Sequence, residues 1–76
     1  MEKLVEYLAK NIVDDPDEVR VKMESEDGRD LLKLSVASED MGKIIGKSGK
    51  VIKAIRTLVK IKAIKENKRV YIELAE

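Results

Sequence analysis

Two glycines three positions apart interrupt a stretch of the chain that otherwise favours helix. Residues 42–58 read Gly-Lys-Ile-Ile-Gly-Lys-Ser-Gly-Lys-Val-Ile-Lys-Ala-Ile-Arg-Thr-Leu, so an apolar pair precedes a loop at residues 46–49 and an amphipathic helix follows it. No bulky side chain covers the loop, and glycine permits the positive φ angles that other residues resist. The loop can therefore approach a partner closely. Amides and the dipole at the start of the next helix favour an anion, such as a phosphodiester backbone.

The charges are strongly segregated along the 76 residues, although the net charge is only +1. Residues 1–42 hold 6 basic and 12 acidic side chains, whereas residues 43–69 hold 10 basic side chains and one acid, Glu66. A polyanion would therefore meet one basic surface on an otherwise acidic chain. Such lysines can also be the solvated face of ordinary helices, but the adjacent glycine loop favours the first interpretation.

The composition argues against most chemistry. The chain has no Cys and no His, so it lacks a disulfide framework and the usual metal-binding and proton-shuttling groups. Carboxylates are concentrated in predicted turns and helix starts, where capping or solvated roles are the default. Ser48 has no histidine to activate it, and Lys47 is better explained as a phosphate contact. We therefore predict no catalytic residue, no cofactor and no metal site.

No segment is typical of a membrane span or of a secretion signal. No apolar run approaches ~20 residues, and residues 1–20 show no basic stretch followed by an apolar one. The sequence predicts a cytoplasmic protein with no membrane partner.

Hydrophobic periodicity and turn residues predict an α+β fold with the order α-β-β-α-α-β. Ser38 is expected to cap the short helix and Asn67 to take a left-handed conformation after the long one. The first two strands should be antiparallel, and a right-handed crossover should make the second and third parallel. Three helices would then cover one face of a three-stranded mixed sheet in a single domain, residues 1–76. The predicted elements are helices over 2–13, 39–45 and 50–65, and strands over 19–24, 32–36 and 69–74, with a hairpin turn at Asp27-Gly28.

The core is expected to be aliphatic, because the chain has no Phe or Trp and only two Tyr. Alternation predicts that Val19, Val21 and Met23 face inward from the first strand. On the long helix, the side facing the core is marked by Val51, Ile52, Ile55, Leu58 and Val59.

In this context the run Met41-Gly42-Lys43-Ile44-Ile45-Gly46-Lys47-Ser48-Gly49 closely resembles the KH-domain motif, in which an apolar pair precedes a Gly-x-x-Gly loop. Size, element order and this run are together similar to the small stand-alone bacterial KH proteins of the KhpA type, over nearly the whole chain. The element order resembles the type II, prokaryotic form of the fold. The resemblance implies a single type II KH domain that binds single-stranded RNA without catalysis, as a post-transcriptional regulator or RNA chaperone.

The resemblance also implies where RNA would lie. Bases would rest on an aliphatic floor with their edges against backbone groups of the second strand, and phosphates would pass the loop. Ile44, Ile45 and Ile52 could each face the groove or the core. We expect the apolar pair, Ile44 and Ile45, to divide, with one side chain in the core and one toward the ligand. Stacking on rings is not expected, since a strand tyrosine such as Tyr71 is more typical of packing. The RNA-binding residues that the motif and its flanking charges indicate are Gly42, Lys43, Ile45, Gly46, Lys47, Ser48, Gly49, Lys50, Lys53 and Arg56.

A nucleotide-hydrolysing phosphate loop is the nearest catalytic alternative. Residues 42–48 follow a predicted strand and precede a helix, as such a loop should. The spacing is wrong, because that motif needs four residues between its glycines and this chain has three. No later apolar strand ends in an Asp that could hold magnesium, since the third strand ends near Glu73 and Glu76.

The alternative from another class is a module for protein assembly. Proteins resembling KhpA pair with themselves and with a larger KH-containing RNA-binding protein, so the resemblance implies a homodimer or heterodimer as the alternative partner. Ile61, Ala63 and Ile64 could supply such a contact, although they could equally pack against Val70 and Ile72.

Overall fold

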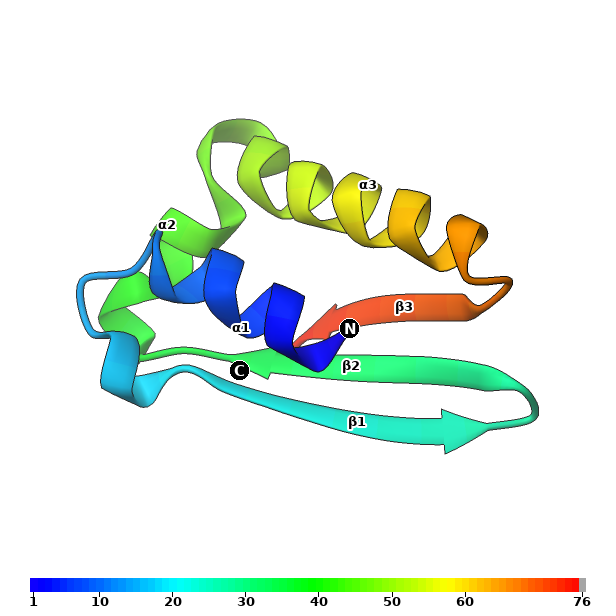
Figure 1. The fold of residues 1–76 in the computed structure, drawn as a ribbon. Helices are drawn as coiled ribbons and strands as arrows, with labels where there is room; N and C mark the ends of the chain where they lie inside the picture. Colours follow the sequence, from blue (N-terminus) through cyan, green and yellow to red (C-terminus); the bar gives the residue numbers. More distant parts are fainter. Residues whose placement is uncertain (76) are drawn as a thin grey trace.

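The structure of the protein, a computed structural model that describes residues 1–75, has the predicted order of elements (Figure 1). Glu76, the last residue of the predicted domain, lies outside the described residues. Short 3-10 turns at Pro16–Glu18, Ser38–Asp40 and Lys47–Gly49 were not predicted. The helices and strands are α1 (Glu2–Lys10), β1 (Arg20–Glu26), β2 (Arg29–Ser35), α2 (Met41–Ile45), α3 (Lys50–Lys65) and β3 (Arg69–Leu74).

The sheet has the predicted mixed topology. Within residues 1–75 the strand order is β1-β2-β3, with β1 antiparallel and β3 parallel to β2. Asp27 and Gly28 connect β1 to β2 with φ of 51° and 76°. Two successive positive φ angles define the type I′ turn that suits the twist of a hairpin, so this predicted turn is confirmed.

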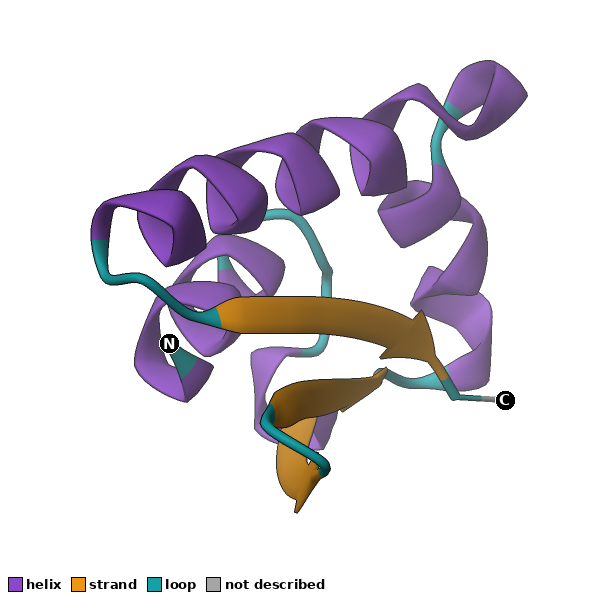
Figure 2. Cartoon of the chain, turned by 90° about the vertical axis from the view of Figure 1, so that its right-hand side faces the viewer, coloured by secondary structure: helices purple, strands orange, loops and turns teal. Residues whose placement is uncertain are grey.

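The helices lie on one face of the sheet, as Figures 1 and 2 show. α1 packs mainly on β1, whereas α3 packs on β3 and α2 packs on α3. Each fully buried aliphatic side chain contributes about 1.5–3 kcal/mol, so these contacts supply most of the stability. The core consists of Val5, Ala9, Val13, Val19, Leu32, Leu34, Ile44, Ile52, Ile55, Val59 and Ile72.

Two residues predicted to face the core are exposed. Met23 is 42% exposed and Leu58 is 49% exposed. Met23 lies at the middle of β1, an edge strand of the sheet, and Leu58 lies at the margin of the buried stripe of α3. Alternation and helical periodicity predict which side a residue is on, but they do not predict how far the opposing layer reaches.

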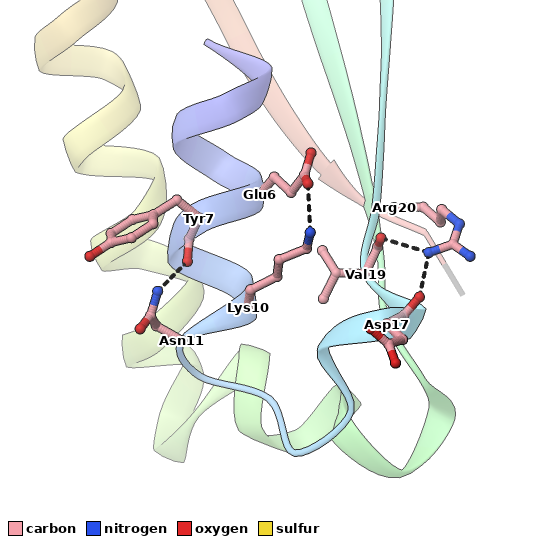
Figure 3. Close-up of polar contacts among 7 residues, drawn as sticks. All are labelled: Glu6, Tyr7, Lys10, Asn11, Asp17, Val19 and Arg20. Carbon is pink, nitrogen blue, oxygen red and sulfur yellow. Dashed lines mark hydrogen bonds and ion pairs between the residues drawn. The ribbon is translucent and has the colours of Figure 1, made fainter.

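Two predicted helix ends are wrong. α1 stops at Lys10, three residues before Val13, where the Asn11 Nδ2 donates a hydrogen bond to the Tyr7 carbonyl oxygen at 2.8 Å (Figure 3). Ser38 makes no side-chain cap, because its hydroxyl points to the Glu39 carboxylate instead. At Asn11 the side-chain amide shares the Tyr7 carbonyl oxygen with the backbone N–H, and at Ser38 the hydroxyl bonds the neighbouring carboxylate and not the backbone of the helix.

The end of α3 is as predicted. Asn67 has a φ of 55°, and the Lys68 N–H donates to the Ala63 carbonyl oxygen at 2.9 Å. The Asn67 N–H donates to the Ile64 carbonyl oxygen, which completes a Schellman motif. This turn sends the chain directly back along α3 as β3.

Candidate nucleic-acid interface

The loop between α2 and α3 needs its first glycine for two reasons. Gly46 has a φ of 74° and a ψ of 173°, a region that only glycine enters readily. A Cβ there would lie 2.3 Å from the Val51 Cγ2 and 2.9 Å from the Val51 nitrogen. Gly49 has a φ of 73°, but a Cβ on it would meet no atom within 4 Å. Gly46 therefore lets the loop fold back onto α3, whereas Gly49 mainly permits a turn.

The residues between the glycines are exposed. Ser48 has a φ of 56°, so the backbone turns with positive φ at Gly46, Ser48 and Gly49. Lys47 and Ser48 are both solvent-exposed. Gly42, the other predicted glycine, lies in α2, and a Cβ added to it would meet no atom within 4 Å. Sterically, therefore, α2 would accommodate a side chain at Gly42.

The apolar pair before the loop divides as expected. Ile44 is fully buried, whereas Ile45 is 38% exposed beside the loop. Ile52, one turn into α3, belongs to the core at 7% exposure. Of the three isoleucines that suited either role, Ile45 is the one available to a ligand.

An open groove of about 470 Å³ lies between α3 and β3. In Figure 1 the two elements run side by side in opposite directions, joined by the turn at residues 66–68. The groove has an aliphatic floor and cations at its rim. Its lining residues are Arg56, Val59, Lys60, Ala63, Ile64, Lys68, Arg69, Val70, Tyr71 and Ile72.

The strand that borders this groove is β3, which corrects the expectation that the second strand would offer backbone groups. β2 pairs with β1 on one side and β3 on the other, so its backbone is occupied. Within residues 1–75, the outer side of β3 pairs with no strand. Because the Ala75 N–H donates to the Leu34 carbonyl oxygen and the bonding direction alternates, the backbone groups of Val70, Ile72 and Leu74 point outward.

The predicted cations divide into two groups. Lys53 and Arg56 share one side of α3 with Lys60, at spacings of three and four residues, and Arg56 lines the groove. Lys50 begins α3 directly after the loop. Lys43 lies apart from them on α2, in an ion pair with the Asp14 carboxylate.

Asp40 supports the loop end from inside. Its carboxylate is 2% exposed and accepts hydrogen bonds from the backbone N–H groups of Asp14 at 3.2 Å and Asp15 at 3.0 Å. These bonds satisfy the buried charge and hold the segment after α1 against the start of α2. The sequence predicts only capping or solvated roles for carboxylates at helix starts such as Asp40, because contacts 25 and 26 residues away leave no local pattern.

Sequence reasoning missed the cations at the far end of the groove. Lys60, Lys68 and Arg69 line the groove with Arg56, although they were not assigned to the site. The helical spacing of Lys53, Arg56 and Lys60 could have indicated the first of them. Lys68 and Arg69 depend on the turn after α3, which places the start of β3 beside the end of the helix.

The part of the chain that the structure describes has neither a membrane-spanning helix nor a cluster of metal ligands. No helix there is long and apolar enough to cross a membrane. Among residues 1–75, no three His, Cys, Asp or Glu side chains gather as metal ligands would.

Comparison with protein families gives a match over nearly the whole chain. Residues 2–74 match the family model described as KhpA/KhpB, KH domain. RNA-binding protein KhpA of Clostridium acetobutylicum is 53% identical over 74 residues, covering 97% of this chain and 99% of the relative. RNA-binding protein KhpA of Listeria monocytogenes is 43% identical over 76 residues and both chains are covered completely.

A solved structure shares the fold. A variant of Era from Aquifex aeolicus, crystallised with GDP.AlF4-, superposes with a TM-score of 0.64 over 96% of this chain, at 22% identity. The matched part is 28% of the Era chain. At this identity the likeness concerns the architecture alone.

Proposed function

Because the chain belongs to the KhpA/KhpB family of KH domains, we propose that it binds single-stranded RNA at the loop of residues 46–49 and the adjoining groove. The observation that carries the proposal is the loop itself. Lys47 and Ser48 within it are exposed, it turns with positive φ at three residues, and it leads directly into a helix start that attracts anions. The relatives carry the name RNA-binding protein.

The proposed mode of binding uses backbone more than side chains. Phosphates pass the loop, where peptide groups and Lys47 contact them. Bases lie against Ile45 and the aliphatic floor, with their edges toward the outward backbone groups of Ile72 and Leu74 on β3. The proposed RNA contacts are the predicted set: Gly42, Lys43, Ile45, Gly46, Lys47, Ser48, Gly49, Lys50, Lys53 and Arg56.

The family is non-enzymatic, so the chain is not an enzyme, as the sequence predicted. We propose a role as a post-transcriptional regulator or RNA chaperone in the cytoplasm. A footprint of about four nucleotides offers few base edges. Sequence selectivity should therefore be modest, and tight association would require several domains or copies acting together.

The test is to place two carboxylates in the loop. Lys47→Asp with Ser48→Asp should weaken binding of single-stranded RNA by about a hundredfold, because like charges would meet the phosphates at their closest approach. Both side chains are exposed, so the far-UV circular dichroism and the thermal midpoint should match the parent. Parental affinity in the folded variant would contradict the proposal.

The kind of RNA provides a second test. A competition assay should favour a single strand over a perfect duplex of the same sequence, because an open groove reads splayed bases and a duplex hides them. Equal or stronger binding of duplex would mean that the contact is only electrostatic.

A second candidate function rests on three exposed apolar side chains of α3, of which Ile64 also lines the groove. Leu58, Ile61 and Ile64 are 49%, 50% and 65% exposed, which is unusual for large aliphatic side chains on one helix. We propose as the alternative that this surface pairs with a second copy or with a larger KH protein. An apolar contact would withstand added salt, whereas RNA binding would weaken steeply.

A further inference from the structure

The groove between α3 and β3 lies beyond the loop, because its lining on α3 starts at Arg56 and includes no residue of the loop. Lys60 lies ten residues along α3 from Lys50, a rise of about 15 Å. Lys68 and Arg69 border the same groove at the start of β3, its opposite end from the loop. A footprint of four nucleotides at the loop would leave this far end unfilled.

The far end has the shape of a ligand site. The whole groove has a volume of about 470 Å³, within the ~300–1,000 Å³ of pockets that hold small molecules, so a nucleotide fits. Val59 and Ala63 form the helix side of the floor, and Val70 and Ile72 form the strand side. The floor is aliphatic, and the Tyr71 side chain, 51% exposed, lies on the opposite face of the sheet beside Glu24 and Leu31.

The charge of the far end selects the class of ligand. Four of its lining residues are cationic, Arg56, Lys60, Lys68 and Arg69, and none of the described lining residues is acidic. Glu66, close by in the turn, is already engaged by Lys62 at 3.4 Å and Lys68 at 3.6 Å. Cations above an apolar floor complement a strand whose phosphates face outward and whose bases face inward.

We propose that this far end, defined by Lys60, Lys68 and Arg69, is a second subsite for the continuation of the same RNA strand. The inference rests on the proposed function, because the strand enters from the loop. Arg56 lies between the two parts and is common to both. The outward backbone of Val70 offers a base edge the same kind of contact that Ile72 and Leu74 offer nearer the loop.

The experiment compares uridine oligomers of four and eight nucleotides on the parent protein. An eight-mer offers more positions than a four-mer, which alone improves affinity by roughly fivefold. The second subsite should raise the total gain to about fiftyfold, one further factor of ten for the added contacts. The additional phosphates should also steepen the salt dependence by about 0.7 for each contact.

A matched pair of variants isolates the subsite. Lys60→Gln with Lys68→Gln removes two cations that line the groove, whereas Lys62→Gln with Lys65→Gln removes two from the same helix that do not line it. Each pair also removes one partner of Glu66, so stability changes should be equal. The first variant should reduce the length gain to about fivefold and leave four-mer affinity nearly unchanged, and the second should keep about fiftyfold.

The failures of the two proposals are distinguishable. If the parent binds the four-mer through the loop but gains only fivefold with length, the second subsite is wrong and the proposed function stands. If both variants lose the affinity gain of the eight-mer equally, the subsite is also wrong, because the summed positive charge of the region would then explain the gain without a localised site. If neither oligomer binds, the proposed function fails, and this inference fails with it.

Discussion

The two ends of the groove between α3 and β3 are built in different ways. The loop end is shaped by backbone: Gly46 has no room for a Cβ, and the buried Asp40 carboxylate fixes the adjoining segment through two peptide N–H groups. The far end is bordered by long exposed side chains. Its turn is closed by the backbone bonds of the Schellman motif, and the side-chain contacts of Glu66 there, with Lys62 and Lys68, are surface ion pairs.

The difference predicts how each end responds to change. A backbone site depends on geometry, so one added atom or one lost internal bond should disturb it. A site made of flexible cations depends on the sum of their charges, so a single replacement there should be tolerated. Four paired substitutions, taken from the largest expected effect to the smallest, test this contrast.

The largest difference should be in stability, between replacing Asp40 at the loop end and replacing Glu66 at the far end. Asp40→Ala leaves two part-buried peptide N–H groups, those of Asp14 and Asp15, without their acceptor, which should cost about 3 kcal/mol of unfolding free energy. For a domain of this size the thermal midpoint would fall by about 12–24 °C. Glu66→Gln at the far end should leave the midpoint nearly unchanged, although Lys62 lowers the pKa of the Glu66 carboxyl from its ordinary value. Equal shifts in the two midpoints would remove the distinction between the ends.

The two loop glycines should also differ from each other. Gly46→Ala combines a glycine-only conformation with a clash against Val51, and should cost about 2 kcal/mol and roughly tenfold in RNA affinity. Gly49→Ala meets no neighbour and should cost only about 1 kcal/mol for its positive φ. Chemical denaturation and titration with a short single strand would measure both. A reversal of the order would show that the loop is not held by its contact with α3.

The cations should act according to their distance from the loop. Replacing Lys50, Lys53 and Arg56 with Gln should weaken binding of a four-nucleotide strand by about fivefold and flatten the salt slope by about 2. The same change at Lys62, Lys65 and Lys68 should alter four-mer binding much less, because the Debye length is roughly 8–10 Å at physiological salt. Titrations at several salt concentrations would compare them. Equal losses would mean that no localised groove directs the strand.

The smallest effect should come from Asp14. Its carboxylate pairs with Lys43, so Asp14→Asn should free that cation for phosphate, tighten RNA binding by about twofold and steepen the salt slope by about 0.7. The Asp14 peptide N–H still reaches Asp40, so the fold should persist. Asp17→Asn, an exposed acid in the same segment, removes the same charge without touching Lys43. If both variants gain equally, Lys43 is not a contact.

Much of the fold follows from local patterns because those patterns are themselves local physics. Asp27-Gly28 permits the two positive φ angles of the hairpin turn, and Asn67 permits the left-handed residue that ends α3. Alternation and the 3.6-residue period indicated the strands and the long helix. The exceptions are Lys10 as the end of α1 and the uncapped Ser38, where the side chains of Asn11 and Ser38 make local bonds that the helical period does not indicate.

The candidate site was only partly predictable. The loop and the cations beside it are contiguous in sequence, so the motif indicated them together. The groove is not contiguous: its second wall is β3, and Lys68 and Arg69 reach it only through the turn after α3. The expectation that the second strand would offer backbone groups was wrong, since β2 lies in the middle of the sheet and is paired on both sides.

The sequence by itself determined the element order, the charge segregation and the loop, because helix and turn preferences and formal charges belong to individual residues and their near neighbours. The tertiary structure decided which isoleucine is exposed, which acid is buried and which cations share a groove. Those outcomes depend on which surfaces meet across 25 or more residues of chain, as between Asp40 and Asp15. No local preference of either residue encodes that meeting, since it is set by how the helices pack on the sheet.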